Sequence, residues 1–401
     1  MPASRDLIEK EVFVVAAART PMGSFCGSLA TVSAPQLGAT VIRAVVEQAR
    51  IDQCEVDEVI MGNVISAGLG QNPARQASIY AGLPPAVGAT TVNKVCGSGL
   101  KSVIWGMQSI QTGLARLIVA GGMESMSCAP YLLLRARDGY RMGNGEVIDA
   151  MVHDGLWDVY GDKHMGLYGD RCAAKYGFTR QQQDDYAEES YLRARRAVKE
   201  GIFDDEIVPV EVMIRKKSTI VAEDEEPARF DATKLRELRP AFSPDGTVTA
   251  GNASSINDGA AAVAIASGGA CAQFGLRPLA KIVGHATFSR EPEWFTLAPI
   301  GAINMLLDQL NWTVANVDLF EINEAFAAVP MAAEQELAIP RSKLNIYGGA
   351  VALGHPIGCS GARLLVTLLT GLRRTGGRRG LACLCIGGGE AIALALEAIE
   401  P

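Results

Sequence analysis

The chain has 401 residues, a hydrophobic fraction of 48% and 43 glycines, a composition typical of a closely packed α/β protein and not of a fibrous or disordered one. Its formal net charge of −7 argues against a nucleic-acid partner, and no run of about 18 apolar residues predicts a membrane span. The nine cysteines form no spaced disulfide framework, and the N-terminal MPASRDLIEKEVF is too charged for a signal peptide. We therefore expect a cytoplasmic protein in a reducing compartment.

Predicted strands and helices alternate in the first part of the chain. A buried strand is predicted at 11–21, an amphipathic helix at 34–50, a second strand at 56–64 and a third at 115–125. This alternation predicts a mostly parallel sheet with helices on both faces.

The stretch TVNKVCGSGLKS, residues 91–102, lies between two of these strands. Thr91, Val92 and Val95 predict a buried strand, and the apolar spacing over 100–110 predicts a helix. Cys96 would then face unpaired backbone N–H groups at the positive end of a helix, an environment that favours the thiolate and predicts a lowered pKa. The alternative is a small cysteine packed at a turn, but the glycines that follow allow a ligand to approach closely.

Residues 128–255 interrupt the alternation with long charged segments, among them a predicted helix in QQQDDYAEESYLRARRAVKEG and the acidic run AEDEEPARFD. We expect these residues to form an inserted loop or lid domain. The N-terminal half of the protein would then comprise 1–127 together with 256–276, and the C-terminal half 277–401.

From about residue 279 the pattern of the first half is repeated. The strand predicted at 317–325 corresponds to that at 56–64, and GHPIGCSGARLLVTLL, like VCGSGLKSVIWGM, is a glycine-rich turn that opens a helix. Val56 and Gly99 are 43 positions apart, and Val317 and Gly361 are 44 positions apart. This similarity favours two related halves with catalytic groups from both at their shared face.

Three residues of the C-terminal half are candidates for chemistry. His355 lies in a glycine-dense turn where it could act as a base, unless it is a solvated turn histidine. Cys385 ends a strand just before three glycines whose N–H groups could bind an oxyanion, although a buried structural cysteine is the alternative. Asn323 follows another strand and could hold a water, orient a histidine or cap a helix. No Cys or His spacing predicts a metal site.

Four blocks together resemble the signature of the thiolase family: VCGSGLKSV, NEAFAA, GGAVALGHPIGCSGAR and CLCIGGG, in this order. RTPMGSF, GGMESMS and GTVTAGNASSINDGAAA extend the resemblance to nearly the whole chain. It implies duplicated βα halves in a five-layered α-β-α-β-α core with an inserted loop domain. It is closest to the short-chain acetyl-CoA acetyltransferase branch.

The resemblance implies a reversible ping-pong condensation of two acetyl-CoA molecules to acetoacetyl-CoA and CoA. Cys96 would carry the acetyl group as a thioester, His355 would take its proton, and Cys385 would act on the α-carbon of the second acetyl-CoA. Asn323 would hold a water in one oxyanion hole with His355, and the backbone N–H groups of Cys96 and Gly387 would form the other. The CoA thioesters are substrates, and neither a cofactor nor a metal is expected.

The resemblance also implies residues that contact the CoA thioester. Arg229 would face the nucleotide and Ser254 the pantetheine arm. His164, Met165 and Phe326 would border the acyl and pantetheine pocket. The pair His164–Met165 matches the short-chain branch and argues against a broader 3-ketoacyl-CoA thiolase.

Phe295 departs from the methionine of the commonest biosynthetic members and is similar to the branch that accepts 2-methyl-branched substrates. One alternative function is a broader 3-ketoacyl-CoA thiolase of fatty-acid degradation. Another is a non-catalytic protein that binds acyl-CoA or lipid. The stretch RARDGYRMGNGEVIDAM resembles the segment that joins dimers of this branch, which implies a homotetramer with no membrane or nucleic-acid partner.

Overall fold

The computed structural model describes residues 10–214 and 217–399, so residues 1–9 of the stretch that predicted no signal peptide lie outside it. The elements that precede the interruption follow the predicted alternation closely. They are β1 (Val12–Arg19), β2 (Gly23–Ser24), α2 (Ala34–Gln48), β3 (Glu58–Gly62), α3 (Pro73–Tyr80), β4 (Gly88–Val92), α4 (Ser98–Gln111) and β5 (Leu117–Ser125). After the interruption, β12 (Asn257–Ser267) and α9 (Gly268–Phe274) complete this half.

The C-terminal elements repeat this order of strands and helices. They are β13 (Ala280–Ser289), α10 (Ala298–Leu310), β14 (Leu319–Ile322), α11 (Ala328–Leu337), α12 (Ala350–Leu353), α13 (Ser360–Thr375), β15 (Arg379–Ile386) and β16 (Glu390–Ala398). One detail recurs in both halves. The Asp57 carboxylate accepts the N–H groups of Arg116 and Leu117, and the Asp318 carboxylate accepts those of Arg378 and Arg379.

The strands form one 10-stranded sheet in the order β14-β15-β16-β13-β1-β12-β5-β3-β4, with β2 paired to β12. The pairs β3–β4, β3–β5 and β14–β15 are parallel, but β12, β1, β13 and β16 pair antiparallel with their neighbours. The prediction of a mostly parallel sheet is therefore wrong. The last strand of each half, β12 or β16, lies antiparallel beside the first strand of that half, β1 or β13. The alternation of strands and helices alone does not predict this pairing.

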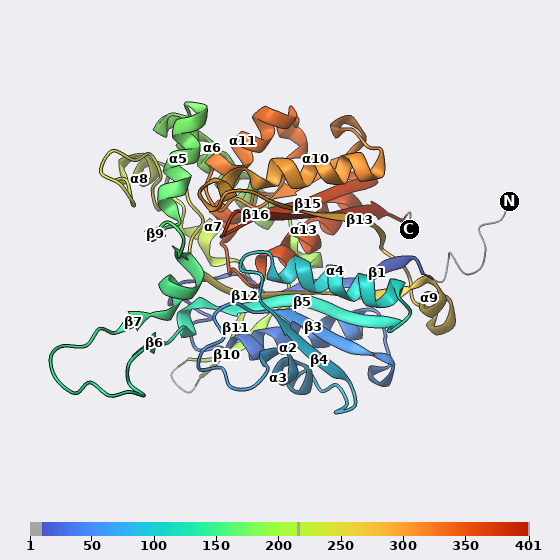
Figure 1. The fold of residues 1–401 in the computed structure, drawn as a ribbon. Coiled ribbons are helices and arrows are strands. Elements are labelled where there is room, and N and C mark those ends of the chain that lie inside the picture. Colours follow the sequence, from blue (N-terminus) through green and yellow to red (C-terminus); the bar gives the residue numbers. More distant parts are fainter. Residues whose placement is uncertain (1–9, 215–216, 400–401) are drawn as a thin grey trace.

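The two halves of the sheet stack on either side of a central helical layer (Figure 1). The helices α2 and α3 cover the outer face of the N-terminal strands, and α10 covers the outer face of the C-terminal strands. Between them, α4 and α13 lie against each other within a third apolar core. This arrangement confirms the predicted five-layered α-β-α-β-α fold.

The segment between β5 and β12 holds short strands and helices on one side of the layers (Figure 1). They are β6 (Tyr131–Leu132), β7 (Ile148–Asp149), β8 (Trp157–Asp158), β9 (Lys163–His164), α5 (Gly166–Tyr176), α6 (Arg180–Lys199), β10 (Val210–Ile214), β11 (Lys217–Val221), α7 (Glu225–Arg229) and α8 (Ala232–Glu237). The chain between β6 and β7 extends away from the body as a long arm. The limits 128–255 for an inserted domain stay a prediction.

Two glycines allow the N-termini of α4 and α13 to touch. A Cβ atom on Gly99 would lie 2.9 Å from the Ala362 nitrogen and 3.0 Å from the Gly358 carbonyl oxygen, and one on Gly361 would lie 2.5 Å from the Leu100 nitrogen. Backbone atoms cannot move aside as a flexible side chain can. The crossing therefore brings the turn that opens α4 next to the turn that opens α13.

Candidate active site

Cys96 lies in a strained turn between β4 and α4. The preceding Val95 has φ +46°, a conformation that is rare for a β-branched residue and typically costs about 1–3 kcal/mol. Ser98 holds this turn, because its hydroxyl accepts the Lys94 N–H at 2.8 Å and donates to the Val95 carbonyl at 2.6 Å. Asn93 accepts the Val95 N–H at 2.9 Å. The strand predicted through Val95 thus ends earlier, at Val92, and Cys96 is left partly exposed at the start of the helix.

The backbone amides of Gly387 and of Cys96 itself favour the Cys96 thiolate. Burial has the larger effect and Glu124 adds a like charge, so the pKa of Cys96 rises to about 12. The predicted lowering of this pKa is therefore wrong. The helix N-terminus is present as expected, but loss of water around the sulfur outweighs it.

Cys385 occupies the end of β15 and is buried. Burial raises its pKa well above the usual value, and the nearby sulfurs of Cys96 and Cys383 raise it further. Gly387 follows two residues later and adjoins the Cys96 turn, since a Cβ atom on Gly387 would lie 3.9 Å from the Val95 Cγ1 atom. The structure thus brings the turn of Cys96 next to the strand end that carries Cys385 and Gly387, with one thiol from each half of the fold.

His355 lies buried in the turn before α13. Its Nδ1 is 2.6 Å from the Ser360 hydroxyl, and its backbone N–H donates to the Asn257 side chain at 2.9 Å. Burial lowers the pKa of His355 to about 3, with the Arg363 cation contributing, so the imidazole is neutral at pH 7. The turn that carries His355 adjoins the turn that carries Cys96, because Cys96 packs in one apolar cluster with Ile357. His355 is thus not a solvated turn residue.

Asn323 follows β14 and lies beside His355, with its Nδ2 3.5 Å from each ring nitrogen. It does not cap α11, whose N-cap is Ala327. Its side-chain oxygen is buried and has no hydrogen-bond partner within residues 10–214 and 217–399. A buried amide oxygen of this kind generally requires a water or ligand, so the pair can accommodate one.

An apolar cluster of side chains surrounds Cys385. Phe295, Phe326 and Met165 cluster with it, and a Cβ atom on Gly387 would lie 3.2 Å from the Met165 methyl group. His164 stacks on Phe242 at 4.6 Å between ring centroids. Phe242 in turn packs edge-on against Phe326 at 6.3 Å.

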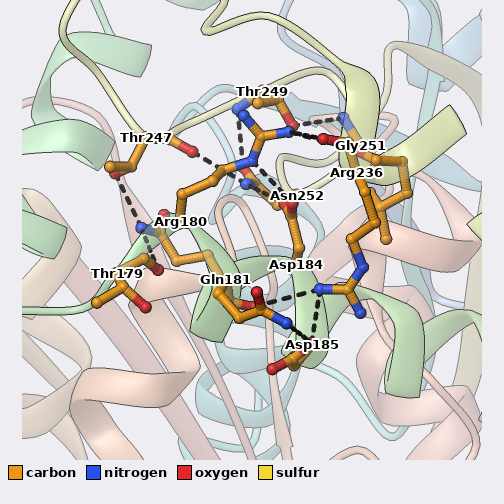
Figure 2. Close-up of polar contacts among 12 residues, drawn as sticks. Thr179, Arg180, Gln181, Asp184, Asp185, Arg236, Thr247, Thr249, Gly251 and Asn252 are labelled. Carbon is orange, nitrogen blue, oxygen red and sulfur yellow. Dashed lines mark hydrogen bonds and ion pairs between the residues drawn. The ribbon is translucent and has the colours of Figure 1, made fainter. Parts of the chain in front are cut away.

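Ser254 is fixed against the segment that follows Asn323. Its N–H and its hydroxyl both donate to the Ala325 carbonyl, at 3.0 and 3.1 Å. Figure 2 shows what holds this loop: the Asn252 amide donates to Asp184 at 2.8 Å, and Arg180 pairs with the same carboxylate at 2.8 Å. The helix α6 of the interrupting segment thereby positions the loop beside the apolar cluster.

Two family models match consecutive parts of the chain. The model described as "Thiolase, N-terminal domain" matches residues 12–269, and "Thiolase, C-terminal domain" matches residues 276–398. The chain belongs to the thiolase family.

Curated and solved relatives agree with this assignment. The chain is 52% identical to proteins named acetyl-CoA acetyltransferase from Chromobacterium violaceum, over 96% of this chain and 99% of that one, and from Escherichia coli, over 98% and 100%. It is similar to the crystal structure of Acat5 thiolase from Ascaris suum in complex with coenzyme A, with a TM-score of 0.92, 43% identity and coverage of 97% of this chain and 100% of that one. The predicted family and acyltransferase class are confirmed.

The thiolase site contains a residue that the sequence did not single out. Glu124, fully buried at the end of β5, accepts the N–H groups of Val64 at 2.9 Å, Ile65 at 3.2 Å and Gly358 at 2.9 Å. It therefore joins the loop after β3 to the turn that carries His355. Burial raises its pKa to about 7 despite these donors. The sequence signal that could have identified Glu124 was its place in GGMES, at the end of a strand that faces the other half.

Arg229 is not part of this cluster. It ends α7, is 65% exposed and pairs with Glu226 at 3.8 Å. Arg195 fixes this end of α7 by donating to the carbonyls of Pro227, Ala228 and Phe230. No contact within the described residues joins Arg229 to the thiols, so its role toward a nucleotide stays a prediction.

Two features are absent from residues 10–214 and 217–399. No group of three or more His, Cys, Asp or Glu side chains there could hold a metal ion. No helix there is long and apolar enough to cross a membrane.

Proposed function

We propose that this thiolase is an acetyl-CoA C-acetyltransferase that joins two acetyl-CoA molecules to acetoacetyl-CoA and CoA, reversibly. The names of relatives 52% identical to it over almost the whole chain support this activity. The observation that carries the mechanism is the contact between the Cys96 turn and the strand end that carries Cys385 and Gly387: a Cβ atom on Gly97 would lie 2.5 Å from the Ile386 Cδ1 atom. A nucleophile, an oxyanion donor and a second acid or base would thereby act at one site.

In the first half-reaction the Cys96 sulfur attacks the acetyl carbonyl while His355 takes the thiol proton. The carbonyl oxygen gains negative charge, which the N–H groups of Cys96 and Gly387 stabilise. The C–S bond to CoA then breaks, and the Cys385 thiol gives its proton to the leaving CoA thiolate. Cys385 is left as a thiolate, and His355 keeps the Cys96 proton until the second half-reaction returns it. Acetyl-Cys96 and free CoA are the products.

In the second half-reaction Cys385 removes a proton from the α-carbon of a second acetyl-CoA. The enolate oxygen is stabilised by His355 and by a water held at Asn323. The α-carbon attacks the thioester carbonyl, the bond to the Cys96 sulfur breaks, and that sulfur regains its proton as acetoacetyl-CoA leaves. Losing one such oxyanion donor typically lowers the rate by about 10²–10³.

Trapping of the covalent intermediate tests this proposal. Incubation with radiolabelled acetyl-CoA and acid quenching should leave one labelled thioester per chain, located on Cys96 by peptide mass spectrometry. Cys96→Ser should lose the thioester label, and Cys54→Ser, at an exposed cysteine outside the pocket, should retain it. Label on another residue would refute Cys96 as the nucleophile, and condensation without a labelled enzyme would refute the ping-pong mechanism.

The pocket supports short acyl groups. Phe295 is 3% exposed and packs edge-on against Tyr168 at 6.2 Å, so aromatic rings occupy the space that a long acyl chain would need. Thiolysis of acetoacetyl-CoA should therefore be fastest, with 2-methylacetoacetyl-CoA next and a longer 3-ketoacyl-CoA slowest. Equal rates on the longer substrate would favour the broader thiolase of fatty-acid degradation.

We also propose a homotetramer located in the cytoplasm, with CoA thioesters and CoA as its small-molecule partners and no further cofactor. The arm between β6 and β7 supports the assembly, because it extends from the body and exposes Leu134 and Met142 at 61% and 89%. Exposed apolar side chains on a protruding segment are typical of contact surfaces.

A further inference from the structure

The Gly387 amide lies in a three-residue glycine loop that joins β15 to β16 and is closed by the pair Ile386–Glu390. Gly388 and Gly389 have φ +92° and +94°, in the region that only glycine adopts freely. The loop begins where β15 ends at Ile386, and β16 starts at Glu390. The turn around Cys96 is strained at Val95, and Ser98 and Asn93 hold it only within the N-terminal half, so contacts between the halves must set its position relative to Gly387.

One ion pair connects these two turns. The Lys94 ammonium lies 2.5 Å from the Glu390 carboxylate, with side chains only 20% and 32% exposed. Lys94 is two residues before Cys96, and Glu390 is three residues after Gly387. The Ser289 hydroxyl donates to the other Glu390 oxygen at 3.2 Å, which fixes the carboxylate on the C-terminal half.

We propose that Lys94 and Glu390 are a pair of positioning residues that hold the Cys96 turn against the Gly387 amide across the two halves of the fold. Neither side chain acts on the substrate in this proposal. The ion pair sets the distance between the nucleophile and one donor of its oxyanion hole. It rests on the proposed acetyl transfer, for which Gly387 is that donor.

The chain provides a matched control. Lys281 pairs with Glu11, also between the two halves, with side chains 34% and 35% exposed. Lys281 pairs in the sheet with Glu397, whereas Glu390 pairs with Ser289 at the opposite end of the same strands, about 27 Å away at 3.4 Å per residue. Loss of either pair should affect stability similarly, but only one pair lies at the active site.

The experiment compares Lys94→Met and Glu390→Gln with Lys281→Met and Glu11→Gln in acetoacetyl-CoA thiolysis. Both Lys94→Met and Glu390→Gln should lower kcat about three- to fivefold, the scale of one partly exposed ion pair, with the KM for CoA unchanged. Glu390→Gln is essential because Lys101 also faces Glu390 and could replace Lys94. The control variants should keep the wild-type kcat.

A charge exchange completes the test. Lys94→Glu combined with Glu390→Lys should recover most of the kcat that either reversal alone removes. Lack of recovery, or equal losses in the control variants, would overturn the positioning role while the wild-type enzyme still transferred acetyl groups. Absence of acetyl transfer in the wild type would instead refute the proposed function.

Discussion

The three reactive side chains of the site are uncharged at pH 7 in the free chain. Burial raises the pKa of the Cys96 thiol to about 12, raises that of Cys385 well above its usual value and lowers that of His355 to about 3. A thiolate–imidazolium pair would therefore be unfavourable before substrate binds. Proton transfer from Cys96 must accompany attack on the carbonyl, where the developing charge moves to the oxyanion donors.

The pKa of His355 predicts a specific dependence of stability on pH. Because its pKa is lowered on folding, the unfolded chain binds a proton between about pH 6.5 and 3 that the folded chain does not. The contribution of His355 to stability is complete above pH 6.5 and is lost as the pH falls. At pH 5 the loss is about 2 kcal/mol.

Denaturant unfolding of the wild type and of His355→Asn tests this dependence. The difference in their free energies of unfolding should shrink by about 2 kcal/mol between pH 7 and pH 5, because asparagine does not titrate. A difference that is the same at both pH values would show that His355 ionises equally in the folded and unfolded chains.

The two cysteines of β15 should differ sharply in function. Cys385→Ala should still form acetyl-Cys96. In deuterated water, however, it should exchange the α-hydrogens of acetyl-CoA at least about 10² times more slowly than the wild type, which is the usual contribution of a general base. Cys383→Ala changes a buried thiol two residues earlier that packs in the outer core, and should retain exchange. Mass spectrometry of recovered acetyl-CoA distinguishes the two, and equal exchange would exclude Cys385 as the base.

At the scale of helices and strands, the crossing of α4 and α13 predicts the effect of single methyl groups. Gly99→Ala places a Cβ against backbone atoms of the opposite turn, whereas Gly106→Ala in the same helix meets only side-chain atoms, with Ile265 Cδ1 at 2.9 Å and Ile118 Cγ2 at 3.2 Å. Both changes replace a helical glycine by alanine, the residue with the highest helix propensity. Gly99→Ala should destabilise the protein by about 2 kcal/mol and reduce kcat, and Gly106→Ala by much less.

Thermal unfolding and thiolysis rates of these two variants check this prediction. Wild-type stability in Gly99→Ala would mean that the two turns do not touch. Equal losses in the two variants would assign the effect to general overpacking instead of the crossing.

Local patterns sufficed to predict most elements and the residues of the site. The helix at 34–48, the strand β1 and the place of Cys96 before a helix can each be predicted from residue types that are neighbours in the sequence. The direction of β12 and β16, the φ of Val95 and the pKa of Cys96 could not be predicted in this way. Each depends on parts of the chain that only the fold brings together, such as Gly387 and Glu124 near the sulfur.

At the scale of the whole molecule, the arm between β6 and β7 predicts assembly. Replacing residues 133–142 with a short Gly-Ser linker should leave a smaller oligomer, because it removes the exposed apolar residues of the arm. Sedimentation velocity should show the wild type as a tetramer and the variant as a dimer. Unchanged sedimentation would place the contact elsewhere, and a wild-type monomer at micromolar concentration would refute the tetramer.

The position of β1 in the sheet has a consequence for synthesis. This strand pairs with β12 and β13, whose residues are made roughly 240 to 270 positions later. At about 5–20 residues per second, this apolar strand stays without its hydrogen-bonding neighbours for on the order of 10 seconds or more during synthesis. An apolar segment exposed for that time is prone to aggregation, so the order in which the strands are translated favours assistance by chaperones.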